Sequence, residues 1–194
     1  MPIIKIVKTP VYTYAIWEIK ESLSSLINML KLTKSEKVYL NTISNVDRQK
    51  QSISARLIFN QLVNKKVEIN YNKHGYPYCQ NFKTISISHS GIFSMALISE
   101  QIIGIDIQQK NPKVESIKNK FLHHDELIYL NKTNLLNKTN LIKTLHMIWG
   151  AKESIYKTLN GLDCSFKKNI FITDFKSNKA IGRYQSNTKK INYK

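Results

Sequence analysis

The chain has 194 residues, of which 42% are apolar, enough to fill one ordinary domain or two small halves that share a core. Its 30 basic residues outnumber 13 acidic ones and give a net charge of +17, so its partners are expected to be anionic, although charge does not say which anion. Cys79 and Cys164 lie far apart, outside any CxxC or Cys/His spacing, so the sequence indicates neither a disulfide framework nor a structural zinc site.

The N-terminal stretch does not resemble a signal peptide. Lys5 and Lys8 interrupt its apolar residues and Glu18 follows soon after, and no later segment approaches a membrane-spanning run. We therefore expect a soluble cytoplasmic protein. The basic residues are mostly lysines spread among Asn and Ile, unlike the Arg-rich arm of a dedicated nucleic-acid module, so part of the charge is equally well explained as a solvated surface.

The first third of the chain predicts a sheet with helices packed on it. Partly alternating β-branched and aromatic residues over 2–18 predict two strands joined at Pro10. Apolar residues at three-to-four spacing predict helices over 21–30 and from about 47 to 63, with a shorter one over 35–43.

Short strands are predicted next, and the last two are expected to pair as a hairpin. They cover 67–71, 84–88, 93–99 and 102–107. The second half then favours helix over 116–161, interrupted near Thr133, and strands over 170–175 and 180–184. A repeat, NKTNLL followed by NKTNLI at 131–142, is interpreted as a duplicated loop or helix end without chemistry.

The segment ISISHSG at 85–91 ends a predicted strand with Ser88, His89 and Ser90 followed by a glycine. Hydroxyls, an imidazole and a permissive glycine at a strand end suit a phosphate contact. They equally suit a polar turn that closes a hairpin, so this motif alone does not decide.

The segment IGIDIQ at 103–108 places two oxygen ligands on one side of a predicted strand. Asp106 and Gln108 would point to the same face, opposite Ile105 and Ile107. A carboxylate and an amide oxygen suit a hard cation such as magnesium, which keeps water and phosphate oxygens in its shell. An Asp at a strand end is also common as a cap or turn residue.

The segment IWGAKESIYKTLNG at 148–161 predicts a helix with functional groups along one face. Trp149, Glu153 and Lys157 follow one another at four-residue steps, with Lys152 beside them. A carboxylate one turn before an ammonium is also typical of a simple surface salt bridge, worth about 0.3–0.5 kcal/mol.

The order and spacing of these three segments, ISHSG, GIDIQ and W-x-x-K-E-S-x-x-K, resemble the Sfp-type 4'-phosphopantetheinyl transferases. HGYPY at 74–78 occupies the place of the G-K-P segment of that family, and FLHHDE at 121–126 resembles its F-F-S-x-x-E segment. The resemblance covers roughly residues 45–162, and such an ordered set is more specific than any single motif.

The resemblance implies an α+β fold of two similar halves in a pseudo-twofold arrangement, with coenzyme A and magnesium between them. The expected division gives an N-terminal α+β half over 1–100 and a C-terminal α+β half over 101–194 that carries the metal and catalytic residues. The implied reaction moves phosphopantetheine from coenzyme A to a serine of an apo acyl or peptidyl carrier protein, leaving 3',5'-ADP. A monomer is expected, with no membrane or nucleic-acid partner.

The resemblance also implies roles for individual residues. Asp106 and Glu153 would hold the magnesium ion, with Gln108 as a further ligand, and Glu153 would help to deprotonate the carrier serine directly or through a metal-held water. Lys157 would offset charge on the phosphates as the bridging bond breaks.

Contacts to the nucleotide are implied for four residues of the first half. Ser88 and His89 would contact the nucleotide phosphates, and His89 would contact the 3'-phosphate. Lys37 and Ser52 align loosely with residues that contact the 3'-phosphate in relatives.

The sequence departs from the family pattern at three places. Gln108 stands where many members have Glu, so metal affinity is expected to be weaker, and Tyr76 replaces the lysine of the G-K-P segment. The chain ends soon after Tyr184, which indicates a compact version or an incomplete C-terminal half. One alternative is therefore a degenerate member that binds coenzyme A or a carrier protein without turnover. A less favoured one, a basic nucleic-acid-binding protein, leaves the ordered motifs unexplained.

Overall fold

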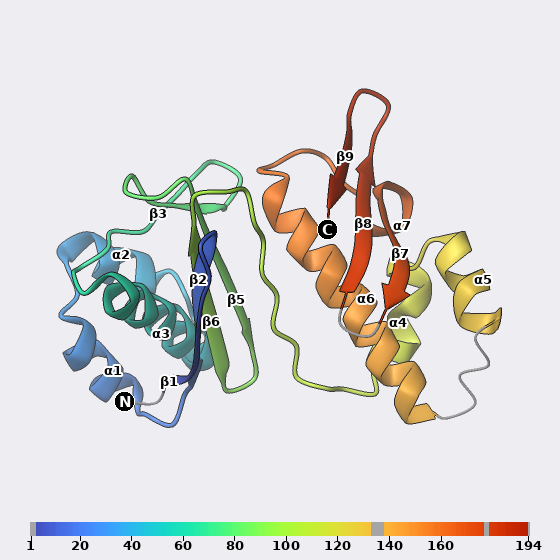
Figure 1. The fold of residues 1–194 in the computed structure, drawn as a ribbon. Coiled ribbons are helices and arrows are strands. Elements are labelled where there is room, and N and C mark those ends of the chain that lie inside the picture. The colour runs from blue at the N-terminus through green and yellow to red at the C-terminus, as the bar shows by residue number, and fades with distance from the viewer. Residues whose placement is uncertain (1–2, 133–137, 177–178, 194) are drawn as a thin grey trace. The chain divides into compact units, whose positions relative to one another are not determined.

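A computed structural model describes residues 3–132, 138–176 and 179–193 (Figure 1). Contacts divide the chain into two compact units, Met1–Ile107 and Gln108–Lys194. The boundary falls inside the IGIDIQ segment, so Asp106 belongs to the first unit and Gln108 to the second. Each unit contains both helices and an antiparallel sheet.

The first unit is built on a four-stranded antiparallel sheet in the order β1-β2-β6-β5. Its strands are β1 (Ile3–Lys8), β2 (Tyr12–Glu18), β5 (Thr84–Ser90) and β6 (Phe93–Ser99). The predicted strands on either side of Pro10 are confirmed as β1 and β2, which pair with each other.

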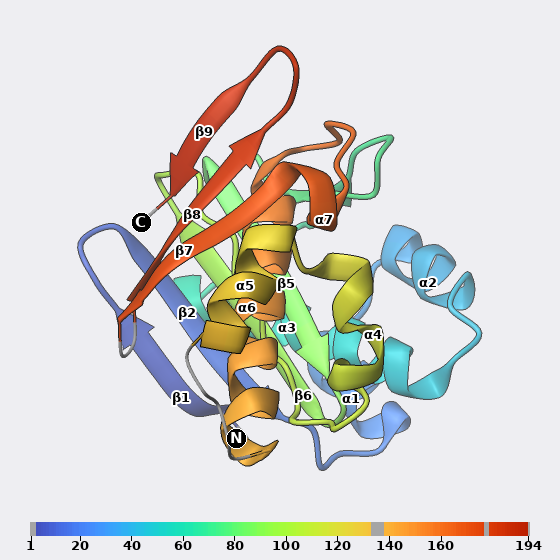
Figure 2. The same cartoon turned by 90° about the vertical axis from the view of Figure 1, so that its right-hand side faces the viewer.

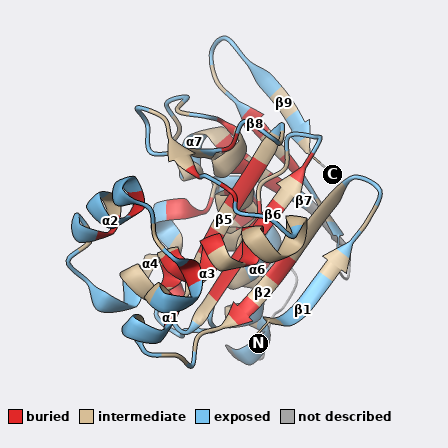
Figure 3. Ribbon diagram, turned by 90° about the vertical axis from the view of Figure 1, so that its left-hand side faces the viewer, coloured by how far each residue is buried: buried red, intermediate tan, exposed pale blue. Residues whose placement is uncertain are grey.

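Three helices complete this unit, and each begins at a side chain that caps it. They are α1 (Leu23–Leu30), α2 (Lys34–Asn41) and α3 (Val46–Val63), capped by Ser22, Thr33 and Asn45. The three helices expected here are thereby confirmed. Buried residues of all three helices and of β2, β5 and β6 form most of the core (Figure 3).

The predicted strand over 102–107 and its hairpin with 93–99 are wrong. Because β6 already pairs with β2 on one side and β5 on the other, it has no edge left to offer. The 102–107 segment instead follows the sheet face opposite α3 (Figure 1), where Ile105 packs against Met95 and Leu97. The predicted strand over 67–71 shrinks to β3 (Asn70–Tyr71), which pairs with β4 (Pro77–Tyr78).

The second unit has four described helices beside a three-stranded antiparallel sheet in the order β7-β8-β9 (Figure 2). The helices are α4 (Val114–Phe121), α5 (His124–Lys132), α6 (Lys138–Thr158) and α7 (Phe166–Asn169). The strands are β7 (Ile170–Lys176), β8 (Lys179–Gln185) and β9 (Lys190–Tyr193).

The sequence predicted most of this second unit. The helical region and the strands that became β7 and β8 are confirmed, whereas β9 and the break between α4 and α5 were not predicted. The interruption expected near Thr133 lies outside the described residues, as does part of the NKTN repeat. None of the helices in the described part of the chain combines the length and apolar character needed to cross a bilayer.

Helix α6 carries Trp149, Glu153 and Lys157 and is held in place by one buried stripe of its surface. The stripe repeats at three-to-four spacing, as expected for a helix packed on a sheet. It consists of Leu145, Ile148, Lys152, Ile155 and Leu159. A lysine therefore occupies the middle of an otherwise apolar contact.

Candidate functional site

Ser88 and His89 are neighbours on β5 and face opposite sides of the sheet, because side chains alternate along a strand. Ile85 and Ile87 share the face of His89 and belong to the core beneath α3. Ser86 shares the face of Ser88, over which the 102–107 segment runs. The ISHSG motif thus contributes side chains to two separate sites, one on each face of the sheet.

On the first face, Ser88 binds the Asp106 carboxylate. Its hydroxyl donates to Asp106 Oδ1 over 2.7 Å and accepts a hydrogen bond from the backbone N–H of Ile107 over 3.1 Å. Ser88 is buried. The candidate metal ligand is therefore held by contacts within the first unit.

On the second face, His89 lies beside Arg48. Arg48 stands in the first turn of α3, and its Nη1 lies 2.8 Å from Nδ1 and 2.7 Å from Nε2 of His89, where it can donate to whichever ring nitrogen carries no proton. Gln51 fixes this end of α3 to the β5–β6 turn by donating to the Gly91 carbonyl over 2.7 Å. A guanidinium, an imidazole and a helix N-terminus together suit an anion such as phosphate.

Sequence reasoning missed Arg48. The available signal was its position in the first turn of a helix that was itself predicted, but its pairing with His89 joins residues far apart in the chain. Only the packing of α3 on the sheet brings them together.

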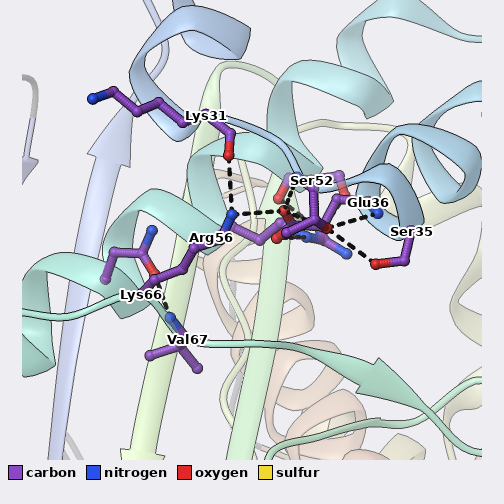
Figure 4. A network of polar contacts seen from close by, with 9 residues as sticks. Lys31, Ser35, Glu36, Ser52, Arg56, Lys66 and Val67 are labelled. Atoms are coloured by element: carbon purple, nitrogen blue, oxygen red, sulfur yellow. Dashed lines mark hydrogen bonds and ion pairs between the residues drawn. The ribbon is translucent and has the colours of Figure 1, made fainter.

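Ser52 lies one turn after Arg48 on α3 and serves the packing of α2 on α3 (Figure 4). Its hydroxyl accepts a hydrogen bond from Arg56 Nη1 over 2.7 Å. Buried Arg56 also lies over the Tyr39 ring, 5.0 Å from its centroid, and 4.0 Å from Glu36 Oε1. The structure thus ties Ser52 to a buried arginine.

Lys37 is exposed on α2, next to Glu36 in the chain. Glu36 faces inward, where its Oε2 lies 3.1 Å from Lys66 Nζ. Burial acts to raise the pKa of Glu36, but hydrogen bonds from Thr33 and Lys66 outweigh it and hold the pKa below its ordinary value. Lys37 therefore lies on the solvent-exposed side of α2, and the inward contacts of Glu36 hold that helix in place.

Glu153 and Lys157 lie one turn apart on α6, both half-buried and beside its buried stripe. One turn before them, Trp149 packs edge-on against Phe121 at 4.9 Å between ring centroids and tilted against Phe166 at 5.6 Å. Trp149 thus anchors the helix, while the carboxylate and ammonium remain partly accessible.

Lys152 is fully buried and fixes α6 to its neighbours. Its Nζ lies 2.7 Å from Glu126 Oε2 and donates to the carbonyls of Phe121, Phe166 and Ile170. Burial lowers the pKa of Lys152, and the Glu126 carboxylate opposes this shift. Because Lys152 precedes Glu153, these bonds also fix where Glu153 leaves the helix.

The candidate metal ligands are divided between the units. Asp106 lies in the first unit, and Gln108 and Glu153 lie in the second. The described residues contain no group of three or more His, Cys, Asp or Glu side chains able to hold a metal ion. Two carboxylates and an amide fit magnesium chemically, because that ion usually takes one or two carboxylates and completes its shell with water and substrate phosphates.

Comparison with known families adds an independent finding. Residues 102–194 match the family model of the 4'-phosphopantetheinyl transferase superfamily. This region contains Asp106, Gln108, Glu153 and Lys157, together with the whole of the second unit. The match supports phosphopantetheine transfer in general and a transferase of this superfamily. The chain matches none of the curated proteins with which it was compared.

Proposed function

We propose that this chain transfers the 4'-phosphopantetheine group of coenzyme A to a serine of an apo acyl or peptidyl carrier protein, as a magnesium-dependent, Sfp-type enzyme. The superfamily match over 102–194 is the observation that carries the proposal, because it contains both the GIDIQ and the W-x-x-K-E-S-x-x-K segments. The ISHSG motif and the Arg48–His89 pair add support from the first unit.

The proposed chemistry is a single displacement at phosphorus. The serine oxygen forms a bond to the phosphorus that carries the pantetheine, and the bridging bond of the pyrophosphate breaks. The bridging oxygen leaves as part of 3',5'-ADP, and Glu153 takes the serine proton directly or through water. Lys157, one turn further along α6, offsets the negative charge that develops on the leaving phosphate.

Asp106 and Glu153, with Gln108, would hold the magnesium ion. When bound, it would supply positive charge at the pyrophosphate. Because Gln108 brings no charge of its own, the carboxylates of Asp106 and Glu153 would provide the electrostatic attraction. The hydrogen bond from Ser88 gives Asp106 a defined position for this role.

Arg48 and His89 would bind the 3'-phosphate of coenzyme A at the start of α3. A guanidinium carries five N–H donors, so Arg48 can contact His89 and a phosphate together. The net charge of +17 would attract both the polyanionic coenzyme and an acidic carrier surface.

The proposal extends to the organisation of the enzyme. It includes a cytoplasmic monomer of two α+β halves, residues 1–100 and 101–194, related by a pseudo-twofold axis. The similar plan of the two units, a long helix on an antiparallel sheet, supports it.

The decisive experiment is the intact mass of an apo acyl carrier protein after incubation with this protein, coenzyme A and magnesium. We expect a gain of one phosphopantetheine, lost when magnesium is omitted. Absence of any gain with both fatty-acid and peptide-synthesis carriers, from a folded protein, would overturn transfer. Coenzyme A binding without a mass gain would identify a degenerate binder.

A further inference from the structure

We propose that Ser88 is a positioning residue, whose hydroxyl orients the Asp106 carboxylate for a divalent cation. This inference rests on the proposed function, because it takes Asp106 as a metal ligand. It replaces the phosphate contact that the family resemblance implies for Ser88 and leaves phosphate binding on this strand to His89.

The hydrogen bonds of Ser88 carry the inference. A hydroxyl has one proton to donate, and Ser88 donates it to Asp106 Oδ1 over 2.7 Å. That distance is typical of a hydroxyl bound to an ionised carboxylate. Its oxygen also accepts from the Ile107 N–H, and the side chain is only 5% exposed. A phosphate would have to break the bond to Asp106 to receive this proton.

The bond has a direct consequence for metal affinity. The 102–107 segment is not a strand, so no ladder of backbone hydrogen bonds sets the direction of Asp106. Ser88 performs this function by holding both the Asp106 carboxylate and the next backbone N–H. Partners that orient metal ligands typically change metal affinity about 10–100-fold when removed.

Ser86 provides a matched control. It lies two residues earlier on the same face of β5, is equally buried, and its hydroxyl accepts from the Ile105 N–H over the same 3.1 Å. Ser86→Ala therefore removes one anchor of the segment, whereas Ser88→Ala removes one anchor and the donor to the carboxylate. The difference between the two variants isolates the bond to Asp106.

The experiment measures Mn²⁺ affinity by electron paramagnetic resonance with saturating coenzyme A. We expect Ser88→Ala to weaken binding about ten-fold and Ser86→Ala to stay close to wild type. In an Asp106→Ala background, Ser88→Ala should have no further effect, because the side chain through which Ser88 acts is gone. A general structural role would instead persist in that background.

Equal affinities for the two serine variants, or an undiminished Ser88→Ala effect in the Asp106→Ala background, would overturn the inference. Should Ser88→Ala fail to fold by circular dichroism, Ser88→Cys keeps the shape of the side chain with a slightly larger atom and a weaker donor, and it must also weaken binding. If Asp106→Ala itself leaves Mn²⁺ affinity unchanged, the proposed metal site fails together with the role of Ser88. If only Asp106→Ala weakens binding, the metal site stands and the role of Ser88 fails.

Discussion

Lys152 and Glu126 form an ion pair inside the second unit, with 2.7 Å between Nζ and Oε2 and side-chain exposures of 0% and 3%. Glu126 also accepts from the backbone N–H groups of His123 and Ile172, so the pair joins α6 to the start of α5 and to β7. Two charges and their hydrogen bonds thus replace apolar packing directly beside Glu153.

We expect Lys152→Met to lower the free energy of unfolding by about 3–5 kcal/mol, the usual effect of removing one partner of a buried pair. Glu126 would remain as an uncompensated buried charge, and three carbonyls would lose their donor. Urea unfolding measures the change. Lys143→Met, at an exposed position of the same helix, serves as the control. Equal effects of the two substitutions would contradict this reading.

The stability that Glu36 contributes should depend on pH. Its pKa is lower in the folded state than the ordinary 4.5, so its carboxylate stabilises the fold fully above about pH 4.5 and this contribution is lost as pH falls through the lowered pKa. We therefore expect the difference in unfolding free energy between wild type and Glu36→Gln to be largest near neutral pH and to shrink in acid. A difference that stays constant down to about pH 3 would refute the expectation. The exposed Glu68 supplies a control substitution by Gln.

Gly182 on β8 leaves little room for a side chain beside Ile155. A Cβ at this position would collide with Ile155 Cδ1 of α6 and lie 3.4 Å from Ile172 Cδ1. We expect Gly182→Ala to destabilise the protein by about 1–3 kcal/mol, as overpacking does. Adding Ile155→Val removes the colliding methyl group, so the double variant should lose less stability than the sum of the single losses. Strict additivity in thermal or urea unfolding would show that the contact is not the cause.

Glu153→Gln should abolish phosphopantetheine transfer while leaving the fold intact. The substitution keeps the size of the side chain but removes the carboxylate proposed to bind magnesium and to accept the serine proton. Glu115→Gln on α4 removes a half-buried carboxylate from the same unit and should load carrier normally. Intact mass of the carrier provides the readout. Unchanged loading by Glu153→Gln would remove the residue from the mechanism.

Arg48→Gln should weaken coenzyme A binding about ten-fold or more, the scale of a lost hydrogen bond to a charged group. Its affinity for 3'-dephospho-coenzyme A should match that of wild type, because that analogue lacks the phosphate that Arg48 is proposed to bind. Lys65→Gln removes the same charge beyond the other end of α3. Isothermal titration calorimetry compares both ligands. Equal losses for the two ligands would place Arg48 outside a 3'-phosphate site.

The sequence predicted elements whose pattern is local. The apolar spacing of α1 and α3 and the alternation around Pro10 each lie within one stretch of chain, and both are confirmed. The 102–107 segment has the same β-like composition, but it cannot pair with β6, because β2 and β5 occupy the two edges of that strand. That competition involves partners far apart in the chain and leaves no local signal.

The site shows the same division between local and distant information. The motifs placed Ser88 and Asp106 as candidates, but not their hydrogen bond to each other, and they missed Arg48 entirely. The sequence placed Lys152 next to Glu153 and Lys157, a pair typical of a surface salt bridge. The burial of Lys152 was not predicted, because charged residues are rarely buried. Its carbonyl partners come from α4, α7 and β7, which only the folded unit brings together.

Because Ser88 and His89 face opposite sides of the sheet, the register of β5 determines which partner each side chain meets. Their pairing with Met95 and Ser94 of β6 assigns the hydroxyl to Asp106 and the imidazole to Arg48. Inserting one residue ahead of Ser88 while the pairing with β6 is kept would exchange the two faces, and neither side chain would reach its partner. For protein engineering, this means that inserting or deleting an odd number of residues in β5 would disrupt both contacts at once, whereas a substitution at Ser88 or His89 affects only the contact on its own face.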